Sequence, residues 1–316
     1  MSHIYYEVAP EDVGQKLGDV IASKMKVSKR LVKRCKAHEE GILVNGQRRT
    51  VRYIIEQGDC ISLAMAPSDR PSDIVHEEKP LSVVYEDDLL MVVDKPPGVT
   101  MFPRRRGELG SLAGAVLAHM EKNGEACHFH PVSRLDIGTS GLVLLAKNSY
   151  AAGQLSKNRP TKHYQCFAYG RVPQSIYMRQ PICEVEKTYR QLTTALFSVG
   201  SSGKDCATLA QPLYYEDRLR ATALWIRLDT GRRHQIRVHL AHQGHPLIGD
   251  VAYGGPAIEA GRPLLHAASI SYQHPLDGRR MHHFLGMHRY SNEPEEIIHP
   301  TLQKDLSNFI ETEVDV

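Results

Sequence analysis

The segment 134–141, with the sequence RLDIGTSG, holds an arginine and a carboxylate two positions apart and runs straight into the apolar segment 142–146. The two glycines favour a turn, and the apolar residues that follow favour a buried strand. Such a loop presents Arg134 and Asp136 at the end of a sheet, where a carboxylate can act as a nucleophile or as a base. A turn-forming aspartate is the other interpretation, because Asp, Gly, Thr and Ser are ordinary loop residues.

A second polar cluster lies far downstream, over residues 230–240 (TGRRHQIRVHL). Apolar side chains recur in it at helical spacing, so we expect a helix over residues 232–243. Thr230 is placed to cap the start of this helix, and Gly244 is placed to end it.

Three arginines of this cluster, Arg232, Arg233 and Arg237, are candidates for binding anions such as a phosphate or a carboxylate. Cations near a helix N-terminus oppose the helix dipole unless an anion binds there. Arg233 and Arg237 are four positions apart, so on a helix one guanidinium could contact a carboxylate while the other holds a phosphate. A solvated basic face is the alternative interpretation.

Several segments together resemble the RluA/RluD-type RNA pseudouridine synthases, and they occur in that family's order. The resemblance covers about residues 81–285. A single match would be weak, whereas separate motifs in one order are specific. The matching segments are 92–98 (VVDKPPG), 134–141 (RLDIGTSG), 162–166 (KHYQC), 231–239 (GRRHQIRVH), 244–250 (GHPLIGD) and 264–267 (LLHA).

The resemblance implies that the protein isomerises specific uridines in structured RNA, with ribosomal RNA as the first target class and transfer RNA as the other, and without a cofactor. Asp136 matches the family's essential carboxylate, which either attacks the anomeric carbon of the sugar or removes a neighbouring sugar proton. Arg237 is our candidate for the cation that keeps this carboxylate ionised. Tyr164 matches the active-site tyrosine, whose ring can stack on uracil and whose hydroxyl can move the carbon-5 proton.

Further arginines are expected to contact the RNA. Arg134 matches the family's arginine that enters the base stack where the target uridine leaves, and a phosphate contact is its alternative role. Arg104 and Arg105 belong to a basic loop for which we expect phosphate contacts. Ser133 stands where the family commonly has a histidine, which puts in doubt only the positioning of this loop.

These segments must be positioned by one larger domain. We expect this catalytic domain to span residues 81–290. Strand-like runs outnumber helical ones and neighbour one another like hairpins, which favours an α+β fold with a mostly antiparallel mixed sheet. The expected helices cover 111–122 and 232–243. The expected strands cover 81–85, 89–93, 142–146, 164–169, 188–197, 221–228 and 265–272.

Residues 1–66 predict a smaller α+β module. A helix around Leu17 is followed by a second helix after the cap Ser28, then by a strand that closes on the 45–46 Asn-Gly turn and a further strand at 61–64. The module resembles the S4-like RNA-binding module known from a ribosomal small-subunit protein.

The second helix of this module carries a stripe of basic residues, and no acidic residue occurs between positions 24 and 36. A solvated face normally mixes both signs of charge, so this stripe favours a polyanion such as RNA. The candidate RNA-binding side chains are Lys26, Lys29, Arg30, Lys33 and Arg34.

The remaining segments are polar. Residues 67–80 predict a semi-stiff linker because they are rich in Pro, Ser and charged residues, and residues 291–316 predict an acidic C-terminal extension. The net charge of +3 over 316 residues is only mildly basic and does not by itself indicate nucleic acid.

Composition and spacing argue against several other classes. The scattered cysteines form no Cys-x-x-Cys pair, which indicates free thiols. His239, His242 and His245 recur every three residues, but Gly244 would end the helix before the third, so we expect no metal site. The chain shows no signal peptide and no apolar run of ~18 residues, so we expect a soluble, cytoplasmic protein. We also expect the protein to be a monomer.

A non-catalytic RNA-binding or ribosome-assembly factor that keeps the fold is the competing functional class. The presence of Asp136, Tyr164 and Arg237 argues against it, because a protein without catalysis would be free to lose them. Release of tritium from carbon 5 of uridine in labelled RNA separates the two classes.

Overall fold

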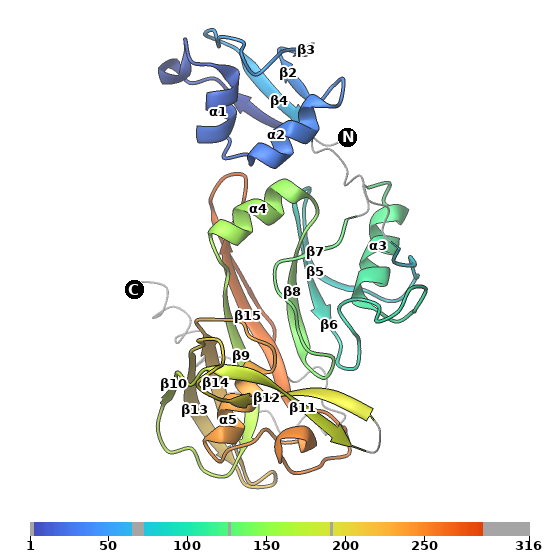
Figure 1. Cartoon of the computed structure of the whole chain (residues 1–316), viewed down its shortest axis with the longest axis vertical. Helices are drawn as coiled ribbons and strands as arrows, with labels where there is room; N and C mark the ends of the chain where they lie inside the picture. The colour runs from blue at the N-terminus through green and yellow to red at the C-terminus, as the bar shows by residue number, and fades with distance from the viewer. Residues whose placement is uncertain (1–2, 65–72, 126–127, 190–191, 287–316) are drawn as a thin grey trace. The chain divides into compact units, whose positions relative to one another are not determined.

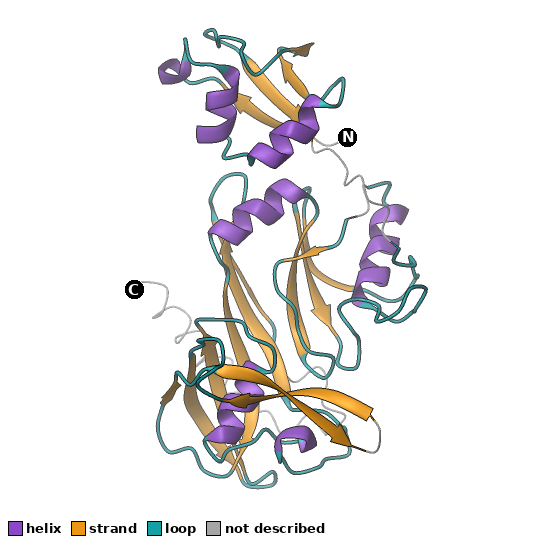
Figure 2. Ribbon diagram, in the orientation of Figure 1, coloured by secondary structure: helices purple, strands orange, loops and turns teal. Residues whose placement is uncertain are grey.

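The computed structural model describes residues 3–64, 73–125, 128–189 and 192–286 of the 316-residue chain (Figure 1). The chain divides into two compact units. The first comprises Met1–Ile137, Gly141–Lys162 and Ser269–Phe284, and the second comprises Gly138–Ser140, His163–Ala268 and Leu285–Val316. Strands form most of the regular structure in both units, with a few short helices beside them (Figure 2).

The N-terminal part of the first unit is a four-stranded sheet of order β1-β4-β2-β3, against which two short helices pack. All of its strand pairs are antiparallel. Its elements are β1 (His3–Glu7), the 3-10 turn η1 (Pro10–Asp12), α1 (Leu17–Ser23), α2 (Lys29–Lys36), β2 (Ile42–Val44), β3 (Gln47–Arg48) and β4 (Cys60–Ala64).

Local signals in this part act as the sequence predicts. The Ser28 hydroxyl accepts a hydrogen bond from the Leu31 backbone N–H at 3.2 Å and so caps α2. Asn45 and Gly46 have φ values of 53° and 75°, the left-handed pair that a two-residue hairpin turn between β2 and β3 requires. Strand β1 was not predicted, and it pairs with β4 in the register His3↔Ala64.

The core of this N-terminal part includes a residue from much later in the chain. Tyr150, in α4 (Ser149–Lys157), is 9% exposed and belongs to the same apolar cluster as Leu17 of α1 and Ile61 of β4. The side-chain amide of Gln154, also in α4, donates to the backbone oxygen of Lys26 at 3.1 Å. Helix α4, which the sequence did not predict, therefore packs on the N-terminal part.

The rest of the first unit contains a three-stranded antiparallel arrangement of β8, β6 and β5, with β7 also on β8. Every residue of β8 is buried, as its uninterrupted apolar sequence predicts. Its elements are β5 (Ser82–Glu86), β6 (Leu90–Lys95), α3 (Leu112–Lys122), β7 (His130–Pro131), β8 (Ser140–Ala146) and β16 (Arg280–Phe284), which pairs with β15.

The segment expected to be a linker is described from residue 73 onward, and there it lies along α3. The Glu77 backbone N–H donates to the Gly114 oxygen at 3.1 Å, and the Gly110 N–H donates to the Glu77 carboxylate at 2.6 Å. Gly114 is required for this approach, because a Cβ there would lie 2.8 Å from the Val75 oxygen. Residues 67–72 and the predicted extension at 291–316 lie outside the described residues.

The second unit contains the antiparallel strand order β10-β13-β14-β9 and a separate hairpin formed by β11 and β12. The single strand expected over 188–197 is wrong, because this stretch spans both arms of that hairpin. The elements that lie wholly or partly in this unit are β9 (Thr161–Tyr169), β10 (Ile176–Met178), β11 (Ile182–Tyr189), β12 (Leu192–Val199), β13 (Thr208–Glu216), β14 (Ala221–Leu228), α5 (Gln235–His242), the 3-10 turn η2 (Val251–Tyr253) and β15 (Leu265–Gln273). The first two residues of β9 and the last five of β15 belong to the first unit.

These units confirm the α+β class with a large sheet and few helices. Helix α3 starts after Ser111, whose hydroxyl accepts from the Gly114 N–H at 3.1 Å, so its predicted range of 111–122 holds. The predicted strands at 89–93, 142–146, 164–169, 221–228 and 265–272 fall within β6, β8, β9, β14 and β15, and the one at 81–85 overlaps β5.

Candidate active site

The loop that carries Asp136 lies in the first unit, between β7 and β8, and its backbone is held by a buried lysine. Lys95, fully buried at the end of β6, donates from Nζ to the backbone oxygens of Pro96 (3.0 Å), Val99 (2.9 Å) and Ile137 (3.4 Å). The Gly98 N–H donates to the same Ile137 oxygen at 2.7 Å. These hydrogen bonds therefore connect two of the segments that resemble the family, 92–98 and 134–141, at the residue that follows Asp136.

Exposure varies sharply along this loop. Asp136 is half-buried and Arg134 is exposed, so both can meet a ligand. Thr139 and Ser140 are buried, and the Ser140 hydroxyl lies 2.9 Å from Nδ1 of His266. The polar residues after Asp136 therefore anchor the start of β8.

Tyr164 lies in the second unit on β9, where it is 6% exposed. It stands opposite Ile226 of β14 in the antiparallel register. Its neighbour His163 points to the other face of the strand and stacks on Trp225, with ring centroids 5.2 Å apart and planes 13° apart. The stacked pair fixes the strand and so holds the backbone of Tyr164.

Arg237, on α5 of the second unit, forms a bidentate ion pair with Asp250. Its Nε donates to Oδ2 at 2.7 Å and its Nη2 donates to Oδ1 at 2.8 Å. The two side chains are 12% and 1% exposed, and the guanidinium lies 4.8 Å from the ring centroid of Tyr253. These two bonds fix the plane of the Arg237 guanidinium, because a bidentate pair with a carboxylate holds both groups in one orientation.

Sequence reasoning missed Asp250 as a site residue. The sequence signal that could have identified Asp250 is its place at the end of the matching segment 244–250 (GHPLIGD), directly after Gly249. Gly249 has a φ of 81° and a Cβ there would lie 1.9 Å from the Arg262 oxygen, so the tight turn that aims Asp250 at Arg237 needs a glycine.

The helix that carries Arg237 is shorter at its start than predicted. It begins at Gln235 and its cap position is His234, with φ 56°, so the expected start at 232 and the expected cap Thr230 are both wrong. The Gln235 side-chain oxygen accepts from Thr230 and from the Arg232 N–H, both at 2.9 Å, and so satisfies the backbone before the helix. Thr230 therefore bonds to the Gln235 side chain and does not cap the helix.

The end of the same helix follows the prediction. Gly244 has a φ of 82°, its N–H donates to Ala241 at 3.0 Å, and the next N–H, of His245, donates to Leu240 at 2.9 Å. These two bonds form a Schellman motif, in which glycine takes the left-handed position.

Arg232 and Arg233 precede the helix, so the helical i, i+4 relation between Arg233 and Arg237 is wrong. Both side chains are exposed. Arg233 lies 5.5 Å above the Phe197 ring, and Nε of Arg232 donates to the Asp205 oxygen at 3.3 Å. Both remain accessible to an anionic ligand.

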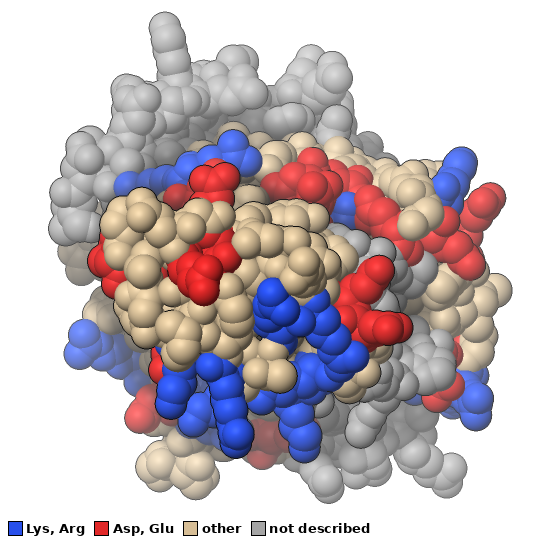
Figure 3. Space-filling view, turned by 90° about the horizontal axis from the view of Figure 1, so that it is seen from above, with Lys and Arg blue, Asp and Glu red and all other residues tan. Residues whose placement is uncertain are grey.

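The other predicted RNA contacts lie in the first unit. Arg104 and Arg105 are exposed, and the Glu108 carboxylate accepts from both of their backbone N–H groups. Figure 3 shows Lys and Arg side chains gathering on one part of the face seen from above, with Asp and Glu elsewhere on it. The described exposed members of the N-terminal stripe are Lys24, Lys26, Lys29, Lys33 and Lys36.

Arg34 differs from the rest of that stripe, because it is half-buried. It lies near His128 and His130, whose pKa values are lowered mainly by burial and further by the positive charge of Arg34. The ring centroids of the two histidines are 5.8 Å apart. The side chain of Arg30 lies outside the described residues.

The histidine series on α5 has ordinary structural contacts. His239 is fully buried, and its ring nitrogens lie 2.9 Å from the Thr208 hydroxyl and 2.9 Å from the Gln180 oxygen. Burial lowers its pKa. The residues that the structure describes contain no group of three or more His, Cys, Asp or Glu side chains arranged to hold a metal ion.

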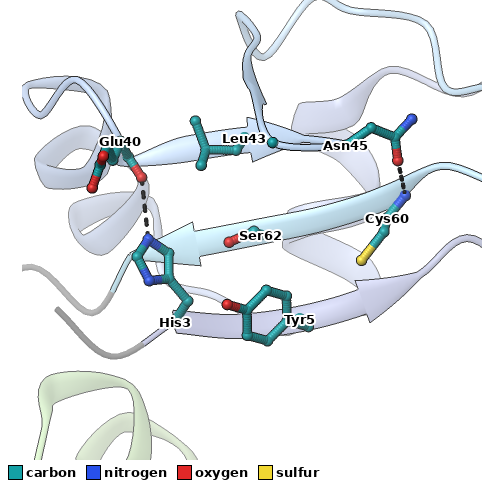
Figure 4. Close-up of a pocket in the computed structure, with 8 residues that line it drawn as sticks. His3, Tyr5, Glu40, Leu43, Asn45, Cys60 and Ser62 are labelled. Carbon is teal, nitrogen blue, oxygen red and sulfur yellow. Dashed lines mark hydrogen bonds between the residues drawn. The ribbon is translucent and has the colours of Figure 1, made fainter.

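A hollow of ≈ 260 Å³ lies on the sheet of the N-terminal part. Figure 4 shows His3 and Tyr5 of β1, Leu43 of β2 and Ser62 of β4 around it. It contains none of the predicted site residues. No helix within the described part of the chain is long and apolar enough to cross a membrane.

The fold and these tied motifs define the class of protein: an enzyme of RNA modification built on a large sheet. The family model for RNA pseudouridylate synthase matches residues 89–242, which include Asp136, Tyr164 and Arg237. The chain belongs to this family and is an RNA pseudouridine synthase, an isomerase that acts on uridine in RNA.

Curated relatives support this over nearly the whole chain. An uncharacterized RNA pseudouridine synthase of Bacillus subtilis (strain 168), YjbO, is 32% identical over 92% of this chain and 97% of its own length. The ribosomal large subunit pseudouridine synthase D of Haemophilus influenzae is 32% identical over 87% of this chain and 88% of its own. The fold is similar to that of human RNA pseudouridylate synthase domain containing 1, with a TM-score of 0.55, 23% identity, and coverage of 76% of this chain and 97% of that one.

Proposed function

We propose that this enzyme converts uridines of large-subunit ribosomal RNA to pseudouridine and that the carboxylate of Asp136 carries the reaction. The observation that supports the residue is the loop around it: Lys95 holds the Ile137 oxygen, so the half-buried Asp136 is presented on a fixed backbone. The substrate class rests on the Haemophilus influenzae relative, whose name specifies the large ribosomal subunit.

The chemistry rearranges one nucleotide without a net gain or loss of atoms. The bond from N1 of uracil to the anomeric carbon breaks, a bond from carbon 5 forms in its place, and the carbon-5 proton is lost while N1 gains one. Asp136 starts the sequence as a nucleophile at the anomeric carbon or as a base toward a neighbouring sugar proton. Both routes use the ionised carboxylate.

Three other side chains have proposed roles in this reaction. Arg237 supplies the positive charge that keeps the carboxylate of Asp136 ionised, and its bidentate pair with Asp250 fixes the orientation of its guanidinium. The ring of Tyr164 stacks on the uracil, and its hydroxyl moves the carbon-5 proton. Arg134, exposed on the same loop as Asp136, fills the space in the RNA stack that the target base leaves.

The N-terminal part is proposed to be an S4-like module that binds RNA. Its support is the set of exposed lysines on and before α2, which are suited to phosphates. In this proposal the module adds affinity and takes no part in bond rearrangement.

The test uses RNA labelled with tritium at carbon 5 of uridine. Wild-type protein should release tritium from a large-subunit ribosomal RNA transcript and not from transfer RNA transcripts. Asp136→Asn should abolish release while RNA affinity stays within a few-fold, because the amide keeps the shape but cannot act as an anion. Release by this variant near the wild-type rate would overturn the role of Asp136.

The RNA target has an independent test. Pseudouridine mapping in RNA from cells that lack this protein should show sites lost from large-subunit ribosomal RNA. If pseudouridines were lost only from transfer RNA, the assignment as a pseudouridine synthase would stand and only the proposed substrate would be wrong.

A further inference from the structure

Lys162, on β9, is a partly exposed cation without a protein partner. Within the described ranges, its ammonium has no hydrogen bond or ion pair to a side chain or to the backbone. It precedes Tyr164 by two positions, and successive side chains of a strand alternate between faces, so the two residues share one face of β9. Strand rise places them about 7 Å apart along the chain.

The electrostatic environment of this ammonium is unfavourable. Burial lowers the pKa of Lys162 from 10.5 to about 8, and no neighbouring charge acts in the opposite direction. The residue is still reached by solvent. The Lys162 side chain is therefore partly buried, and no carboxylate of the described residues forms an ion pair with its ammonium.

An enclosed cation without a counter-ion disfavours the folded state, and a bound anion would remove that cost. The structural lysine Lys95 is the opposite case, since three backbone oxygens satisfy its ammonium. Lys162 lacks such acceptors within the described chain.

We propose that Lys162 binds an RNA backbone phosphate beside the target uridine. This rests on the proposed placement of uracil on Tyr164, since that base would put its own nucleotide's phosphate within reach of the neighbouring side chain on the same face. RNA is the substrate of this enzyme family and carries one phosphate per nucleotide, so the bound substrate itself supplies the anion. Phosphate contacts position the RNA and carry no sequence information.

The direct test follows the ionisation of Lys162 without any turnover. Lysines of the full-length protein are reductively methylated with a ¹³C label, and the Lys162 signal is assigned by its loss in Lys162→Arg. In free protein this signal should titrate near pH 8. Saturation with a short oligouridylate should move its midpoint up by at least one pH unit, because a phosphate favours the charged amine. An unchanged midpoint would overturn the proposal.

Steady-state kinetics provide the second test, with tritium release as the readout. Lys162→Met should raise KM about tenfold and change kcat less than threefold, since the phosphate is bound equally in the ground and transition states. Lys162→Arg should restore most of the affinity. The matched control is Lys122→Met on α3, which removes the same charge from an exposed lysine and should leave KM unchanged.

The outcomes separate this proposal from the proposed function. A fall in kcat without a change in KM would make Lys162 a participant in the chemistry and overturn phosphate binding. If Asp136→Asn stayed active while the Lys162 signal still shifted with oligouridylate, the catalytic assignment would fail and the phosphate site would stand.

Discussion

At the scale of single residues, Arg237 pairs with the carboxylate of Asp250 and is proposed to act on that of Asp136. Its pair with Asp250 is bidentate and nearly closed to solvent, so it is part of how α5 is held to the turn that follows. Its proposed pairing with Asp136 is part of the chemistry. A substitution at Arg237 therefore changes stability and activity together, and a single variant cannot assign either effect.

Arg237→Met should lose most tritium release and should also lower the free energy of unfolding by ~3–5 kcal/mol, because Asp250 is left buried without its cation. The double variant Arg237→Met with Asp250→Asn removes that uncompensated charge and should recover much of the stability, measured by urea unfolding. Its activity should stay low. Recovery of activity along with stability would show that Arg237 only supports the fold.

The ionisation of Lys162 predicts how stability depends on pH. The folded state lowers this pKa from 10.5 to about 8, so between those values the unfolded chain binds more protons and stability rises with pH. Lys162→Met should be more stable than wild type at neutral pH, and the difference should vanish above pH 10.5. Urea unfolding at the two pH values measures this, and an equal difference at both would contradict it.

At the scale of elements, two glycines within helices have opposite surroundings. Gly114 of α3 faces the segment that precedes β5, and a Cβ would lie 2.8 Å from the Val75 oxygen. Gly153 of α4 is exposed, and a Cβ added there would meet no other atom within 4 Å. The same substitution should thus act with opposite sign at the two sites.

Gly114→Ala should destabilise the protein by ~1–3 kcal/mol, because backbone must move to admit the methyl group. Gly153→Ala should stabilise it by up to ~1 kcal/mol through helix propensity alone. Thermal unfolding of both variants is the measurement. Equal and small effects would mean that residues 73–79 do not pack on α3 in solution.

At the scale of the whole molecule, the N-terminal part is not independent of the chain that follows its linker. Tyr150 belongs to its apolar core, and Gln154 donates to the Lys26 oxygen. A truncation that starts the chain near residue 70 would expose both. Loss of RNA binding in such a protein has to be separated from loss of fold.

Deletion of residues 1–70 combined with Tyr150→Ser, which replaces the α4 side chain that the deletion would uncover, should keep a folded catalytic part. Affinity for long RNA should fall, and each lost phosphate contact should flatten the slope of log affinity against log salt by roughly 0.7–0.9. Tritium release at saturating RNA should change much less, because the module is proposed to aid binding and to take no part in bond rearrangement. If the RNA affinity and its salt dependence were both unchanged, the lysine stripe would face solvent or a protein partner and would not bind RNA.

The sequence alone was sufficient to predict those elements whose boundaries depend on residues a few positions away. The cap at Ser28, the turn at Asn45 and Gly46, the stop at Gly244 and the buried strand β8 all follow from residues a few positions apart. The motifs in 134–141 and 162–166 also pointed to the family, since motif residues keep their spacing along the chain.

Contacts between distant residues were decided only by the tertiary structure. Strand β1 forms because β4, far along the chain, offers it a partner, and α5 starts at Gln235 because that side chain also binds Ala207 and Thr208. Asp250 reaches Arg237, and Tyr150 reaches the N-terminal core, for the same reason. Propensity and spacing act within a few residues, whereas these pairs gain their free energy from burial of groups that only the folded chain brings together.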